Sequence, residues 1–226
     1  MYSDWPCPSP SGTTREELLF SFDRQREARL LILPPLFDEA NKFRCQIAGT
    51  MRLFDERGVD TFCPDLPGVN ESLAPHGHQS LAIWRRCAES AATACRATHI
   101  LTIRSSALIA PQGLTGWCFE PCGARPVLQR LLRAEILSAK EAGRTATAEE
   151  LLEAGASDGI TLAGWDLSPE LMKELADGAE PDIVGYEVIK QTDIGGRPLW
   201  LRAENDFDAA QAEALATHII KAMASR

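Results

Sequence analysis

The amino-acid sequence predicts an α/β protein built on a doubly wound, mainly parallel sheet, and three observations support this fold class. Short apolar runs at residues 29–33, 59–64 and 99–103 are typical of strands that helices cover on both faces. Stretches with apolar residues at helical spacing separate these runs, which favours parallel strands joined by right-handed crossovers. Small residues stand at positions 102, 105 and 106 at the end of the third run, where we expect a sharp turn from strand to helix.

The other elements follow from the same two periodicities. Alternating or continuous apolar patterns predict further strands at residues 17–23, 116–121, 182–190 and 198–203. Apolar side chains at helical spacing predict helices at residues 42–57, 81–97 and 208–224. Because the ligand crevice of a doubly wound sheet lies outside the carboxyl ends of its strands, we expect the site among the loops that follow them.

Residues 125–178 interrupt the alternation of strands and helices. They contain one strongly amphipathic segment and two shorter helical ones, of which the second begins at a Thr147–Glu150 capping box and the third at Ser168–Pro169. An inserted set of helices forms either a lid over the carboxyl end of the sheet or a simple cover for one of its faces. We expect a helical lid over residues 125–178.

Composition restricts the classes of partner. The 226 residues suit a single domain, 1–226, and the formal net charge of −9 argues against nucleic acid and anionic membrane surfaces. The seven cysteines are odd in number and scattered, a pattern typical of reduced, cytoplasmic proteins. No cysteine or histidine spacing suits zinc, so we expect no metal, and no cofactor is predicted.

The start of the chain is polar and has no resemblance to a signal peptide. Residues 1–14 are rich in Pro, Ser and Gly, and we expect them to form a loose arm. No apolar run approaches the roughly 18 residues that a membrane-spanning helix needs. The sequence therefore predicts no membrane insertion and a cytoplasmic location.

The turn after residues 99–103 places an arginine where a nucleophile would be expected. A strained strand-to-helix turn of this kind needs small residues two positions before and two after its apex. Arg104 meets this condition, with Thr102 before it and Ser106 after it. An apex at Ser105 would put the bulky Ile103 in the first of these positions, so Ser105 and Ser106 are nucleophile candidates only in a shifted register.

Five stretches, in this order, resemble the α/β-hydrolase superfamily, and more narrowly the exosortase A system-associated hydrolases of bacteria that produce exopolysaccharides. They lie at residues 34–42, 65–72, 102–106, 120–133 and 163–169. The resemblance implies a hydrolase acting on an ester or thioester through a Ser, acid and His triad, with the histidine after the last strand. Residues 202–208 contain no histidine, and His218 falls inside the closing helix. The nucleophile and the base of an ordinary serine hydrolase are therefore missing; neither His76 nor His78 occupies a triad position.

Arg104 suggests a different chemistry. A guanidinium stays protonated and offers five donors in a planar fork, which makes it a poor nucleophile and a good receptor for carboxylates and phosphates. The acidic loop after Pro35 supplies Asp38 and Glu39 as partners across the crevice. Arg104 either holds an anionic ligand or pairs with one of these carboxylates and closes the site.

The remaining candidates each have a binding and a structural interpretation. Asn41 either donates to a ligand or caps the helix that begins at Lys42. Glu120 is either an acid/base group or a carboxylate that is solvated or paired with arginine. Asp65, Gly68 and Ser72 are expected to shape the turn after residues 59–64.

Two functions follow from the sequence. The first is a hydrolase-fold enzyme of the kind that the exosortase-associated resemblance implies. The second is a non-catalytic binding or assembly protein that holds a small-molecule, acyl or anionic ligand with Arg104. Labelling by a fluorophosphonate would distinguish them, because the probe reacts with an activated serine.

Overall fold

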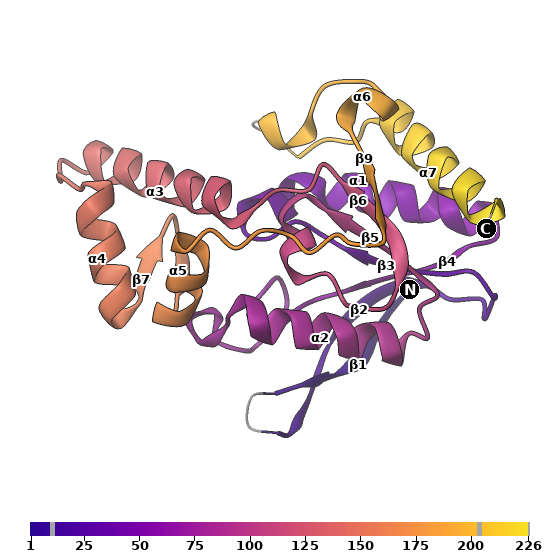
Figure 1. Ribbon diagram of the computed structural model, residues 1–226, viewed down its shortest axis with the longest axis horizontal. Helices are drawn as coiled ribbons and strands as arrows, with labels where there is room; N and C mark the ends of the chain where they lie inside the picture. Colours follow the sequence, from indigo (N-terminus) through magenta and orange to yellow (C-terminus); the bar gives the residue numbers. More distant parts are fainter. Residues whose placement is uncertain (10–11, 203–204, 226) are drawn as a thin grey trace.

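The computed structural model describes residues 1–9, 12–202 and 205–225 and contains a seven-stranded sheet with helices on both faces (Figure 1). The strand order is β1-β2-β4-β3-β5-β6-β9, in which the last five strands are parallel and β1 and β2 are antiparallel. The bounds are β1 Tyr2–Pro8, β2 Thr14–Phe22, β3 Arg29–Leu33, β4 Asp60–Pro64, β5 His99–Ile103, β6 Thr115–Phe119 and β9 Tyr186–Ile189. The predicted α/β fold class is confirmed.

Two hydrophobic layers cover the sheet, one on each face. Helices α1 (Asp38–Glu56) and α7 (Ala209–Ala224) lie on one face, and α2 (Leu81–Ala94) lies on the other (Figure 1). Strand β3 is buried throughout, with Leu30 in the α1 and α7 layer and Leu31 in the α2 layer. Burial on both faces is the physical reason that the central strands read as continuous apolar runs.

The predicted loose arm at residues 1–14 is wrong. Strand β1 pairs antiparallel with β2, from Tyr2 opposite Phe20 to Pro8 opposite Thr14. Trp5 and Cys7 point inward and are buried, and Trp5 Nε1 donates to the carbonyl oxygen of Asp65 at 3.3 Å. Only these two inward side chains indicate a strand, and the polar and proline residues around them obscure the pattern.

The last predicted strand is also wrong. Residues 198–203 were expected to form a strand, but Leu199–Leu201 is a single 3-10 turn, η3, and Ala203 lies outside the described residues. A short helix, α6 (Gln191–Ile194), follows β9, and then Gly195 and Gly196 turn the chain with φ of 72° and 76°. Pro198 has no N–H to donate to a ladder, which disfavours a strand in this segment.

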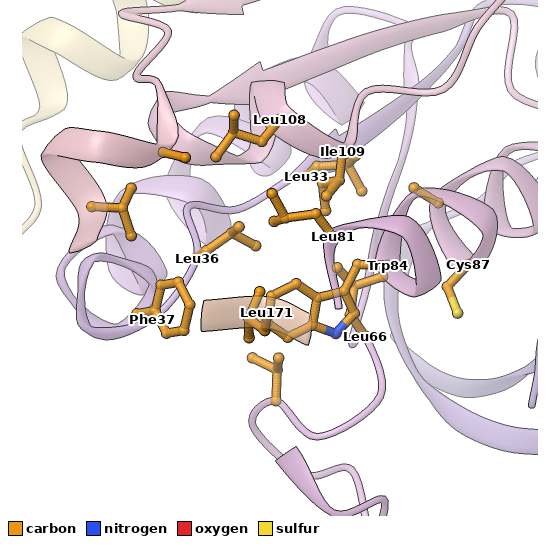
Figure 2. Close-up of a cluster of buried hydrophobic side chains, with 14 of the residues drawn as sticks. Leu33, Leu36, Phe37, Leu66, Leu81, Trp84, Cys87, Leu108, Ile109 and Leu171 are labelled. Carbon is orange, nitrogen blue, oxygen red and sulfur yellow. The ribbon is translucent and has the colours of Figure 1, made fainter. Parts of the chain in front are cut away.

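The insertion at residues 125–178 is mostly helical, as expected. It comprises α3 (Ala124–Glu141), α4 (Ala148–Asp158), the hairpin β7 (Ile160–Leu162) with β8 (Trp165–Leu167), and α5 (Pro169–Ala176). The hairpin was not predicted. The insertion packs at the carboxyl end of the sheet, where Glu174 accepts the backbone N–H of Leu81 at 2.7 Å. Figure 2 draws part of the cluster that joins it to the sheet, with Leu33 from β3, Trp84 from α2 and Leu171 from α5.

An ion-pair network closes the opposite, amino end of the sheet. Arg29 begins β3 and lies opposite Asp60, which begins β4. Asp60 is fully buried and lies 3.1 Å from Nη1 of both Arg29 and Arg26. Arg29 also donates to Asp23, and this hydrogen bond lowers the pKa of Asp23 to about 2. The network satisfies charges that the sheet could not otherwise bury.

Candidate functional site

Arg104 lies at the apex of a strained turn at the carboxyl end of β5. Its φ is 58°, in the left-handed region that non-glycine residues rarely adopt. The helix predicted after the turn is a short 3-10 helix, η2 (Arg104–Ile109). Ser106 fixes this turn, because its Oγ accepts the N–H of Ile103 at 2.9 Å and donates to the carbonyl oxygen of Leu33 at 2.8 Å.

Two side chains and one backbone carbonyl surround the guanidinium of Arg104. Its Nε lies 3.4 Å from Glu39 Oε2, and its Nη1 donates to the carbonyl oxygen of Glu120 at 3.1 Å. Its Cζ lies 4.2 Å from the centre of the Trp200 ring in η3, within range of a cation–π contact. Arg104 as a whole is 9% exposed. It therefore forms an ion pair with Glu39, one of the two carboxylates that the sequence predicted as its partner.

Glu39 is held between two arginines. It is 1% exposed and stands in the first turn of α1, where the helix dipole favours a carboxylate. Arg130 from α3 places Nη1 2.6 Å from Glu39 Oε1, close enough for an ion pair although not aligned for a hydrogen bond. Asp38, the other predicted partner, instead lies 4.0 Å from Lys42. The cluster Arg104–Glu39–Arg130 carries two positive charges and one negative charge.

Arg130 was not among the sequence-predicted site residues. It lies in the 120–133 stretch, but the helical pattern alone does not show which of its arginines turns toward the sheet. Its Nε is buried without a hydrogen-bond partner in the part of the chain that the structure describes. Cys122 lies beside it, and burial raises the pKa of this thiol although Arg104 and Arg130 oppose the shift.

Neither candidate serine is free to act as a nucleophile. Ser105 is fully buried, and its Oγ accepts the backbone N–H of Leu36 at 2.9 Å. Ser106 is fully buried as well and is used by the turn. Across the described ranges, no hydrogen bond joins either hydroxyl to a histidine.

The histidines have other partners. His218 on α7 places Nε2 2.7 Å from Glu187 Oε1. His76 packs against the rings of Phe37, Trp84 and Trp165, and its Nδ1 lies 2.5 Å from the carbonyl oxygen of Asp166. Burial lowers the pKa of His76, so this ring favours its neutral form. His78 is exposed on the same loop.

Asn41 and Glu120 take structural positions. The helix begins at Asp38, four residues before the predicted start at Lys42, and its N-cap is Phe37 with a φ of 61°. Asn41 is therefore an exposed residue of the first turn, and the prediction that it caps the helix is wrong. Glu120 accepts the backbone N–H of Gln191 through Oε1 at 2.6 Å, which anchors the start of α6.

The turn after β4 has the predicted organisation. Asp65 accepts the side-chain amide of Asn70 at 2.7 Å and the N–H of Glu71 at 3.3 Å, and burial raises its pKa. Gly68 has a φ of 80°, and its N–H donates to Ser72 Oγ at 2.9 Å. These hydrogen bonds fix the shape of the loop, and they occupy the side chains of Asp65 and Ser72.

Residues 1–9, 12–202 and 205–225 hold neither a cluster of metal ligands nor a membrane-spanning helix. No group of three or more His, Cys, Asp or Glu side chains there could hold a metal ion. Among the helices of the same residues, none combines the length and the apolar character that crossing a membrane requires.

Solved structures of hydrolases share the fold of this chain. A putative hydrolase from Agrobacterium vitis superposes with a TM-score of 0.58 at 12% identity, covering 99% of this chain and 98% of that one. Mouse alpha/beta hydrolase domain-containing protein 10 gives 0.55 at 11% identity, covering 100% and 99% of the two chains. The chain has the α/β-hydrolase fold.

The carboxylesterase CesB from Bacillus subtilis shares the α/β-hydrolase fold with a TM-score of 0.50 at 10% identity, covering 100% of this chain and 93% of that one. No protein-family model and no curated protein matches the sequence. At identities this low the likeness establishes the α/β-hydrolase fold, and function must be argued from the site itself.

Proposed function

We propose that this chain is a non-catalytic member of the α/β-hydrolase fold class that binds a small anion at its elbow. The observation that carries the proposal is Arg104 at the strained apex after β5, the place where hydrolases of this fold hold their nucleophile. A guanidinium there cannot attack a carbonyl carbon, but it can hold a carboxylate or a phosphate.

The charge of the cluster supports an anionic ligand. Two arginines share Glu39, so the cluster carries a net positive charge at a site that is largely removed from water. Arg104 Nη2 makes no hydrogen bond to the described residues and is not enclosed, and Arg130 Nε is buried without a partner. A small carboxylate or phosphate would satisfy donors of both arginines at once.

The helical insertion acts as a lid in this proposal. It brings Arg130 to Glu39 and covers the carboxyl end of the sheet through α5 and the β7–β8 hairpin. A ligand held between Arg104 and Arg130 would thus join the lid to the sheet. The ligand would then influence how firmly the insertion packs.

The hydrogen bonds of Ser105 argue against hydrolysis. In active hydrolases of this fold, an N–H of the loop between β3 and α1 helps to hold the developing oxyanion. Here the N–H of Leu36, in that loop, donates to Ser105 Oγ instead. Among the described residues, no histidine hydrogen-bonds this hydroxyl, which also argues against ordinary serine-hydrolase chemistry.

We expect no fluorophosphonate labelling of the wild-type protein and no esterase turnover from Arg104→Ser. The variant restores a hydroxyl at the apex, but no histidine is positioned to remove its proton. Labelling is read by intact mass and turnover with a p-nitrophenyl ester, beside an active esterase as a positive control. Labelling at Ser105 or Ser106, or turnover by the variant, would favour the enzyme hypothesis.

A role with exosortase and exopolysaccharide genes is the second candidate. The five stretches between residues 34 and 169 that resemble exosortase A system-associated hydrolases favour it. It is compatible with anion binding, since surface polysaccharides and their precursors carry carboxylates and phosphates. Finding exosortase or polysaccharide genes beside the gene for this chain would support it, and a neighbourhood without them would count against it.

A further inference from the structure

A cavity separate from the elbow lies between the β1–β2 hairpin and the loop that joins β4 to α2. Its volume is about 280 Å³, just below the roughly 300 Å³ at which pockets for drug-sized ligands begin, so it suits a smaller molecule. Apolar side chains form part of its wall, among them Pro67, Pro75 and Ile83. Arg15 and His78 also line it and are both exposed, so the cavity opens to solvent.

A buried carboxylate without a counter-ion lines this cavity. Glu17 of β2 is 3% exposed, and its Oε1 accepts the hydroxyl of Ser72 at 2.9 Å. Among the residues that the structure describes, Oε2 accepts no hydrogen bond and no ion pair neutralises the group. Burial raises the pKa of Glu17, although the hydrogen bond from Ser72 and the charge of Arg15 oppose the shift. Such a carboxylate destabilises the free protein and is available to bind a cation.

Gln79 supplies a second acceptor in the same cavity. Its side chain is buried, and its Nε2 donates to the carbonyl oxygen of Pro75 at 2.8 Å. That bond fixes the orientation of the amide and leaves Oε1 without a hydrogen-bond partner within residues 1–9, 12–202 and 205–225. An ammonium group carries three donors, so one such group can satisfy both Glu17 and Gln79.

The mouth of the cavity carries the opposite charge. Arg15 and Glu17 are two positions apart on β2, and because side chains alternate between the faces of a strand, both lie on the same face. The rise along a strand places their Cα atoms about 7 Å apart. The guanidinium of Arg15 repels a simple amine but attracts a carboxylate, so the two residues together favour a ligand that carries both charges.

We propose that this cavity binds a free amino acid, whose ammonium group pairs with Glu17 and Gln79 and whose carboxylate pairs with Arg15. The apolar wall then contacts the side chain of the ligand. The zwitterion supplies the missing counter-ion of Glu17 without adding net charge to the protein. This site shares no residue with the Arg104–Glu39–Arg130 cluster, so it is independent of the anion site proposed at the elbow.

Thermal unfolding in the presence of each of the twenty standard L-amino acids, at about 10 mM, tests the proposal. A ligand at roughly ten times its Kd raises the midpoint of a protein of this size by roughly 3–6 °C, and we expect at least one amino acid to do so. Isothermal titration calorimetry then compares the amino acid of largest effect with its analogue that lacks the amino group, which should bind at least about tenfold more weakly. No rise with any amino acid, or equal binding of the analogue, would overturn the proposal.

Glu17→Gln and Glu16→Gln form a matched pair on one strand, since Glu16 is exposed on the opposite face of β2. We expect Glu17→Gln to bind the amino acid at least about tenfold more weakly and Glu16→Gln to bind it as the wild type does. Glu17→Gln should unfold at the same temperature as the wild type or a higher one, because it removes a buried charge that has no counter-ion. Unchanged affinity in Glu17→Gln, or an equal loss in Glu16→Gln, would overturn the assignment. The comparison with the analogue uses the wild-type protein, so it holds whether or not either variant folds.

Discussion

Replacing Glu39 with glutamine is expected to lower the free energy of unfolding by about 3–5 kcal/mol, because two arginines would lose the carboxylate they share. Glu39 is 1% exposed, so water cannot replace it beside the buried guanidinium of Arg104. Arg130 is partly exposed and can turn toward solvent, which places the effect nearer the lower value. Chemical denaturation of the two proteins measures the difference.

Two comparisons make this result specific. Arg104→Ala should cost less than Glu39→Gln, because Arg130 still neutralises the carboxylate when Arg104 is removed. Glu71→Gln is the matched control: its pair with Arg44 is exposed on both sides, and we expect a change below about 0.5 kcal/mol. Equal, small changes in all three variants would show that the cluster does not hold the elbow together.

Asp60→Asn is expected to destabilise the protein by about 3–5 kcal/mol, through loss of the buried charge that neutralises Arg29. Asp60 also accepts the backbone N–H groups of Arg24 and Arg26, at 3.1 and 2.8 Å. An amide has one acceptor oxygen and brings a donor of its own, so it cannot satisfy all of these groups. The midpoint of thermal unfolding should fall by roughly 10 °C.

The control for Asp60 is Glu213→Gln, which removes an exposed pair with Arg57. We expect this variant to unfold at the same denaturant midpoint as the wild type, because solvent screens an exposed pair. The Asp60 variant should retain the elbow site, since the two lie at opposite ends of the parallel strands. A loss of stability no larger than that of the control would show that the network at the amino end contributes little.

The central fold could be predicted from sequence because burial on both faces leaves a strong pattern. Strands β3, β4 and β5 are buried along nearly their whole length, and the amphipathic helices between them have period 3.6. The elbow could also be located, since the steric need for small residues around the apex depends only on local sequence. That local rule identified Arg104. Arg104 follows β5 and Glu39 follows β3, so both were expected at the carboxyl edge of a parallel sheet, close to each other.

The parts that escaped prediction depend on tertiary contacts. Strand β1 has two inward side chains, Trp5 and Cys7, too few to stand out among prolines and polar residues. Arg130 reaches Glu39 because α3 packs at the carboxyl end of the sheet. The spacing of residues in the sequence does not show how a helix packs against a sheet. Asn41 was predicted as the N-cap because a polar residue just before an apolar helical pattern commonly caps the helix. The helix begins earlier, at Asp38, and its N-cap is Phe37 in a strained backbone conformation.

Binding of inorganic phosphate, measured by isothermal titration calorimetry, tests the proposed anion site most directly. The proteins to compare are the wild type, Arg104→Gln and Arg133→Gln, the last removing an exposed charge from the same helix as Arg130. We expect the wild type and Arg133→Gln to bind alike and Arg104→Gln to bind at least about tenfold more weakly, since a charge-assisted pair is lost. Equal binding by all three proteins, or no binding by the wild type, would contradict the proposal that the elbow arginine holds an anion.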